Sequence, residues 1–151
     1  MSAPLQIDYY SDVLCIWAWI AQRRLEELQQ QWGEQIAVRY HYLDVFADVE
    51  GKMKKQWADR DGYEGFAQHV IESARPYQDI PVHPDLWKNI RPKSSTNAHL
   101  VLKATQLIHS EEQSTALAHH FREAFFSRNI DIGQLKTLLA IAEEAHCDAK
   151  A

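Results

Sequence analysis

Hydrophobic and polar positions change their period twice within the first 43 residues. Residues 5–10 alternate apolar and polar side chains before becoming aromatic, which is typical of a strand. Over residues 16–32 apolar side chains recur mostly on one helical face, and Gly33 is a natural end for that helix. Residues 36–43 alternate again. We therefore predict a βαβ unit with two parallel strands and a right-handed crossover.

Beyond residue 43 the pattern favours helices, with no convincing strand. The segment from 75 to 93 is expected to be a loop, because its four prolines interrupt helical continuity. Ser94, Ser95 and Thr96 are candidate N-caps for the helix that follows it. The predicted class is α/β, with a βαβ unit over residues 1–45 and an all-helical part over residues 46–151. The helices are expected at residues 52–57, 63–74, 111–127 and 135–145, and the helix that follows the serines carries Ala98, Val101, Leu102, Thr105 and Ile108.

The end of the chain and the small sheet both suggest an incomplete fold. Two parallel strands leave edges that natural proteins usually pair or cover. Asp148 is a candidate N-cap that precedes only three further residues. We expect that the chain is the front part of a longer protein, or that a partner chain, such as a second copy, completes the sheet.

Composition excludes several classes of function. The 151 residues suffice for one domain with a real core. A net charge of −5 and a pI near 5.9 argue against a nucleic-acid surface. No apolar run approaches the roughly 20 residues that span a bilayer, and no secretory signal precedes residue 5. We expect a cytoplasmic protein that binds neither nucleic acid nor membrane.

Cys15 is the leading candidate for chemistry. It lies where the strand pattern gives way to the helix pattern, so its thiol would face unpaired backbone N–H groups and the positive end of the helix dipole. Both favour the thiolate, which is the reactive form of cysteine. The other cysteine, Cys147, lies far along the chain and is not expected to pair with it or to act as its resolving thiol.

The segment Ser-Asp-Val-Leu-Cys-Ile-Trp-Ala-Trp-Ile, residues 11–20, followed by Arg-Arg-Leu-Glu, resembles the DsbA-like thioredoxin-fold family. The match is nearest the branch of FrnE-type oxidoreductases, 2-hydroxychromene-2-carboxylate isomerases and kappa-class glutathione transferases. Residues 91–99 and 121–132 resemble segments of the helical insertion of that family. The resemblance implies a thioredoxin-like βαβ start with a large all-helical insertion. The C-terminal part of the thioredoxin fold, with its cis-proline loop, has no counterpart in this sequence.

The resemblance implies thiol–disulfide oxidoreductase activity, with one departure. The oxidoreductases of the family carry Cys-x-x-Cys, and the second position here is Ala18. Because the second cysteine normally releases the mixed disulfide, an external thiol such as glutathione would have to act in its place. We therefore expect a single nucleophilic cysteine, no bound cofactor, and glutathione as a co-substrate. Whether Ala18 is natural or replaces a cysteine is left open by one sequence.

Two other functions stay open at this point. A glutathione-dependent isomerase or transferase is the first, although a serine usually stands at the Cys15 position in those relatives. A non-catalytic relative or fragment that associates through its sheet edge is the second. The first would bind glutathione without Cys15, and the second would associate with another chain instead.

The remaining candidates have both structural and functional readings. Asp12 is either a cap at the helix start or a site residue. Trp17 is expected to line a substrate groove, whereas Trp19 belongs to the core. Arg91 and Asn97 would face the thiol or a glutathione carboxylate in a family-like arrangement, or else serve the entry to a helix.

A metal site is not expected. Glu143 and His146 have the i, i+3 spacing of carboxylate-bridged metal bundles, but only one such pair is present.

Overall fold

The two predicted strands pair in parallel in a computed structural model, which describes residues 2–145. Strand β1 (Leu5–Ser11) lies beside β2 (Ile36–Tyr42), and helix α1 (Ile16–Trp32) connects them. Gly33 follows α1 with a φ of 47°, a left-handed conformation that favours glycine, before one 3-10 turn leads into β2. The predicted strands and the helix between them are confirmed.

The chain after β2 is helical, as predicted, with small differences at the ends of the elements. The first of these helices begins at Val49, earlier than predicted, because the Asp48 carboxylate accepts a hydrogen bond from the Gly51 N–H at 2.9 Å and caps it. The loop over residues 75–93 contains no helix. The helices are α2 (Val49–Gln56), α3 (Gly62–Ala74), α4 (Thr96–Ile108), α5 (Glu111–Arg122), the π-helical turn η3 (Glu123–Ser127) and α6 (Leu135–Glu144), with a short 3-10 turn, η2 (Ala58–Arg60), between α2 and α3.

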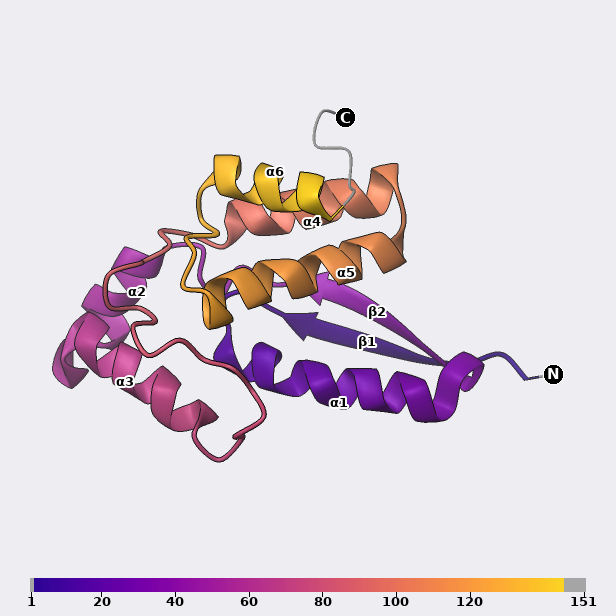
Figure 1. The fold of residues 1–151 in the computed structure, drawn as a ribbon, viewed down its shortest axis with the longest axis horizontal. Coiled ribbons are helices and arrows are strands. Elements are labelled where there is room, and N and C mark those ends of the chain that lie inside the picture. Colours follow the sequence, from indigo (N-terminus) through magenta and orange to yellow (C-terminus); the bar gives the residue numbers. More distant parts are fainter. Residues whose placement is uncertain (1, 146–151) are drawn as a thin grey trace.

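The helices form two groups around the sheet. Figure 1 shows α1 below the strands and α4, α5 and α6 above them, while α2 and α3 lie beyond the carboxyl ends of both strands. The start of α1 lies at that same end. In open α/β sheets ligands bind at the carboxyl ends of the strands, so this end is where a site is expected.

The core is continuous and rich in aromatic side chains. Trp87, from the proline-rich loop, is fully buried and contacts rings from three other segments. Leu117, Phe121, Ala124 and Phe125 are fully buried, whereas Leu135 at the start of α6 is half exposed. Trp87 contacts the rings of Phe46, Phe66 and Phe125.

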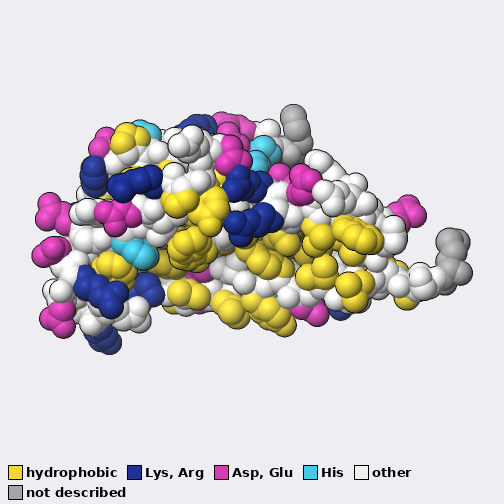
Figure 2. Space-filling view, turned by 90° about the horizontal axis from the view of Figure 1, so that it is seen from below, with side chains coloured by type: hydrophobic (Ala, Val, Ile, Leu, Met, Phe, Trp, Pro, Cys, Tyr) yellow, Lys and Arg dark blue, Asp and Glu magenta, His cyan; other side chains and the backbone are white. Residues whose placement is uncertain are grey.

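Part of the apolar surface lies outside this core. Tyr10 of β1 is largely exposed and stacks on His41 of β2. Hydrophobic side chains gather on the face seen from below in Figure 2, and Trp17 and Trp32 are the large exposed ones on α1. No helix within residues 2–145 combines the length and the hydropathy of a membrane span.

A buried tyrosine hydroxyl gives the fold a pH dependence. Burial raises the pKa of Tyr42 to about 12, and its hydroxyl has no hydrogen-bond partner among the residues that the structure describes. Between pH 10 and 12 the unfolded chain loses this proton while the folded chain keeps it. Stability therefore falls as the pH rises through that window.

We expect Tyr42→Phe to change the free energy of unfolding at pH 7 by less than about 1 kcal/mol, because no hydrogen bond is lost. At pH 11 the variant should be the more stable protein, by about 1 kcal/mol. Urea unfolding at pH 7, 10 and 11 measures both values, with Tyr10→Phe as the control for loss of a hydroxyl. Equal pH dependence in Tyr42→Phe and wild type would contradict this account.

Candidate active site around Cys15

Cys15 occupies the N-cap position of α1. Its backbone is extended (φ −79°, ψ 122°) and its side chain makes no capping hydrogen bond. Its carbonyl oxygen accepts the N–H groups of Ala18 and Trp19, at 3.1 and 3.3 Å. Ile16 and Trp17 lie between Cys15 and Ala18, and their N–H groups have no partner among the described residues. A thiolate at an N-cap takes the place of the oxygen that normally accepts such N–H groups, so the predicted setting of the thiol is present.

The Asp12 carboxylate fixes the turn that leads to Cys15. It is buried, with 1% of the residue exposed, and accepts hydrogen bonds from the Leu14 N–H (2.9 Å), the Phe46 N–H (2.8 Å) and the Ser95 hydroxyl (2.7 Å). These donors come from the turn itself, from the segment after β2 and from the start of α4. Asp12 is therefore not the cap of α1, and its side chain is directed into the protein.

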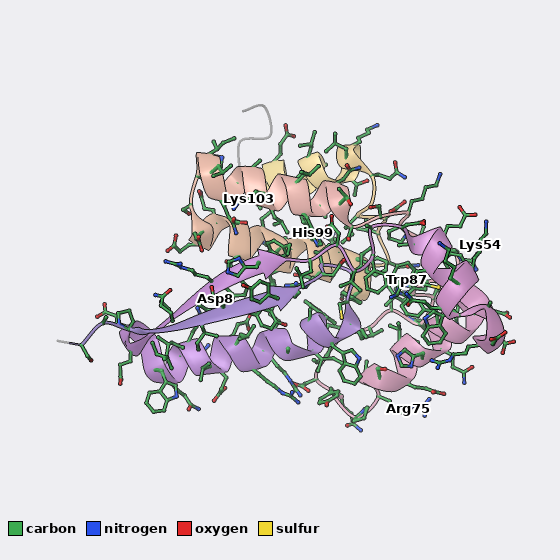
Figure 3. The ribbon with its side chains drawn as sticks, turned by 180° about the vertical axis from the view of Figure 1, so that it is seen from behind. Asp8, Lys54, Arg75, Trp87, His99 and Lys103 are labelled. Atoms are coloured by element: carbon green, nitrogen blue, oxygen red, sulfur yellow. The ribbon has the colours of Figure 1, made fainter. Side chains whose placement is uncertain are left out.

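His99 of α4 holds the same turn through a second bond. Its Nε2 atom accepts the Val13 N–H at 3.1 Å, so the proton of the neutral ring is on Nδ1, which donates to Asp44 Oδ1 at 2.6 Å. The ring also stacks on Tyr42, with centroids 5.2 Å apart. Figure 3 shows His99 beside the carboxyl end of β2. Consecutive amides of the turn are thus bound by side chains: the Val13 N–H by His99 of α4, and the Leu14 N–H by Asp12 of the turn itself.

Trp17, Ala18 and Trp19 have different surroundings. Trp17 is 51% exposed, as a residue of a substrate groove would be. Ala18 is buried. Trp19 is buried as predicted, donates its indole N–H to the Pro81 carbonyl at 3.0 Å and stacks on Phe126. The proline-rich loop is therefore bound to the first turn of α1.

Arg91 and Asn97 make contacts within the helical part. The Arg91 guanidinium lies 4.2 Å from the ring centre of Tyr63, and its Nε donates to the Trp87 carbonyl at 3.2 Å. It lines a cavity of about 810 Å³ beside α3. Asn97 is exposed and donates to the Gly133 carbonyl at 3.3 Å. The structure gives neither side chain a contact with Cys15, so their role toward a substrate stays a prediction.

Sequence reasoning missed three residues that surround the turn: Ser95, His99 and Arg122. Ser95 was expected to cap α4 and occupies that position, but its hydroxyl donates to Asp12 instead. Arg122 is buried and donates to the Ser11 hydroxyl at 3.0 Å. A polar side chain at an otherwise apolar helical position was the signal available for both His99 and Arg122.

No metal centre is formed by residues 2–145, where no three His, Cys, Asp or Glu side chains gather closely enough. Glu143 is described, but its predicted partner His146 lies outside the described residues, as do Cys147 and the predicted cap Asp148.

Comparison with known proteins places this geometry in a family. Residues 6–151 match the DSBA-like thioredoxin domain, which is nearly the whole chain. The chain belongs to this family. The predicted resemblance and the thioredoxin-like fold are therefore confirmed.

Two relatives with different names match almost the whole of this chain. The chain is 25% identical to human glutathione S-transferase kappa 1 over 149 residues, covering 97% of this chain and 65% of that one. It is 24% identical to the ClpXP adapter protein SpxH of Halalkalibacterium halodurans over 152 residues, covering 97% and 47%. The chain thus spans between about half and two thirds of the length of these relatives.

A solved structure shows the same fold. The cytosolic disulfide reductase DsbM from Pseudomonas aeruginosa, in complex with glutathione, superposes with a TM-score of 0.68 at 19% identity. The match covers 93% of this chain and 64% of DsbM.

We expect Asp12→Asn to lower the free energy of unfolding by about 2–4 kcal/mol, because an amide has one acceptor oxygen and its NH₂ group would face N–H donors. Chemical denaturation at pH 7 measures the loss. Asp8→Asn, on the preceding strand β1, is the matched control: its carboxylate forms an exposed pair with His41 and should matter by less than about 1 kcal/mol. Equal losses in both variants would show that the Asp12 bonds do not hold the turn.

Proposed function

We propose that this protein is a thiol–disulfide oxidoreductase that acts through Cys15 alone, with glutathione as the second thiol. The observation that carries the proposal is the partly exposed Cys15 at the N-cap of α1, beside two backbone N–H groups that have no partner within residues 2–145. The family supports disulfide chemistry in general, and the name of DsbM supports a cytosolic reductase as the nearest functional class.

The exchange has two steps. In the first, the Cys15 thiolate attacks one sulfur of a disulfide substrate and forms a mixed disulfide, while the other sulfur leaves as a thiolate and takes a proton. In the second, a glutathione thiolate attacks that mixed disulfide and releases Cys15. A further glutathione frees the remaining substrate thiol, so two glutathione molecules are oxidised for each disulfide reduced. Cys15 itself is unchanged after a full cycle.

Exposed groups near Cys15 would contact the substrate. Trp17 presents a large aromatic surface two residues from the thiol. We propose that it packs against the disulfide substrate or glutathione. Asp12, for which a cap role and a site role were both open, is proposed instead to shape the turn, because its oxygens are occupied by protein donors.

A second candidate follows from the match to glutathione S-transferase kappa 1. In that case the N–H groups of Ile16 and Trp17 would stabilise the thiolate of bound glutathione rather than that of Cys15. Retention of glutathione binding in Cys15→Ser distinguishes this function from the first.

For the oxidoreductase we expect Cys15 to react with iodoacetamide at least about tenfold faster than Cys147 at pH 6.5, because its thiolate is favoured. Mass spectrometry of the two cysteine peptides across a pH series provides the rates. Incubation with glutathione disulfide should also yield one glutathione adduct, at Cys15, which Cys15→Ser lacks. If Cys15 is no faster than Cys147, or forms no adduct, the proposal fails.

The missing second cysteine gives another prediction. We expect Ala18→Cys to shorten the lifetime of the glutathione adduct at Cys15 by at least about tenfold without added thiol, because the new thiol attacks within the molecule. Ala21→Cys, one helical turn farther along α1, is the control and should leave the lifetime unchanged. Timed acid quenching and intact-mass measurement detect the adduct. Equal lifetimes in both variants would show that position 18 cannot serve as a resolving position.

A further inference from the structure

Arg122 is a buried cation without a charged partner. The residue is 3% exposed, and its described polar contact is the hydrogen bond from Nη2 to the Ser11 hydroxyl at 3.0 Å. Its Nε atom has no hydrogen-bond partner, and no carboxylate within residues 2–145 lies within ion-pair distance of it. Guanidinium groups keep their proton in proteins, so this side chain brings a full positive charge into the interior.

Such a charge is costly unless something negative compensates it. Burial of an unpaired ion costs several kcal/mol even after the protein relaxes, and an apolar side chain of similar size is often no worse for stability. A buried cation without a counter-charge in the described part of the chain is therefore expected to have a functional role. The group that compensates the charge should lie nearby, and it can be one that is negative in only some states of the protein.

Arg122 lies beside the start of the turn that connects β1 to Cys15. Ser11, which accepts its hydrogen bond, is the last residue of β1 and immediately precedes the turn. Arg122 also lines a cavity of about 50 Å³ together with Ala18, one turn into the helix that Cys15 caps. Tyr9 lines the same cavity, and its hydroxyl lies within electrostatic reach of both Arg122 and Cys15. Burial raises the pKa of Tyr9, the Arg122 charge lowers it and a Cys15 thiolate raises it.

Other charged groups around Arg122 do not pair with it. Glu26 of α1 lines the same cavity, but its side chain is largely exposed and lies 3.7 Å from His119 of α5. Asp12 is occupied by its three protein donors. The remaining groups that sense its charge are Tyr40 and Tyr42 of β2, with Glu111 at the start of α5 acting on Tyr42.

We propose that Arg122 is the internal cation that stabilises the thiolate of Cys15, and so a positioning residue for the exchange reaction. This inference rests on the proposed function, since it assigns to Arg122 a part in the same site. The N–H groups at the start of α1 supply partial positive charges to the thiol. Arg122 supplies a full positive charge from within the protein interior.

The two roles that Arg122 could have predict opposite effects of its removal. If it served only to hold the fold, Arg122→Met would lower the melting temperature and leave the reactivity of Cys15 as in wild type. If it serves the thiolate, Arg122→Met should keep or raise the melting temperature, because a costly buried charge is gone, while Cys15 becomes less reactive. Arg122→Gln keeps a donor for Ser11 without the charge, and Arg122→Lys keeps the charge.

The experiment measures the rate of alkylation of Cys15 by iodoacetamide, a neutral reagent, from pH 5 to 9 in wild type and the three variants. We expect Arg122→Met and Arg122→Gln to shift the midpoint of the profile to higher pH and to slow alkylation at pH 6.5 at least about threefold. Arg122→Lys should stay within about twofold of wild type. Melting curves and the rate at Cys147 in the same samples serve as controls.

The outcomes separate this inference from the proposed function. Profiles that coincide in wild type, Arg122→Gln and Arg122→Lys, with Cys15 reactive in all, overturn the role of Arg122 and leave the function standing. A shift on loss of the charge, in a protein whose Cys15 forms no glutathione adduct, supports Arg122 and removes the function. A Cys15 that reacts no faster than Cys147 in wild type overturns both.

Discussion

The buried carboxylate of Asp12 is the interaction on which the candidate site depends. Three donors converge on it, from the turn before Cys15, from the segment after β2 and from the start of α4. A carboxylate removed from water needs such partners, and each donor is a group that would itself be costly to bury alone. The same set of bonds therefore fixes the cysteine turn and joins the βαβ unit to the helices. Loss of one oxygen disturbs the fold and the site together.

This constraint has an electrostatic cost for the proposed chemistry. A negative charge buried three residues from Cys15 disfavours a second negative charge on the thiol. The structure contains two features that act in the opposite direction: the free N–H groups at the start of α1 and the buried guanidinium of Arg122. His99, held neutral on Nε2 by the Val13 N–H, adds no positive charge of its own. The proposed chemistry at Cys15 therefore depends on Arg122 as well as on the start of α1.

The sequence predicted the parts of the fold that depend on local pattern. Alternation identified both strands, periodicity identified α1, and Gly33 marked its end where the structure has a positive φ. Cys15 was found for the same reason, since a helix start is a local feature. Ser95 and His99 were not found as site residues, because their partners Asp12 and Val13 lie more than 80 residues away. Arg122 follows the buried Phe121, and only the fold reveals that no carboxylate among residues 2–145 accompanies it. The predicted division of the chain at residue 45 stays a prediction.

The contrast between positions 15 and 18 limits how the proposed reaction can proceed. In a dithiol site the second cysteine attacks the mixed disulfide from within the helix, but here that position is a buried alanine and no thiol can act from that side. The attacking thiol must arrive from solvent, on the side where Cys15 is partly exposed and Trp17 presents its ring. A second protein thiol would have to fit against this surface, whereas a small thiol needs little room. The geometry therefore favours glutathione over a protein partner for the resolving step.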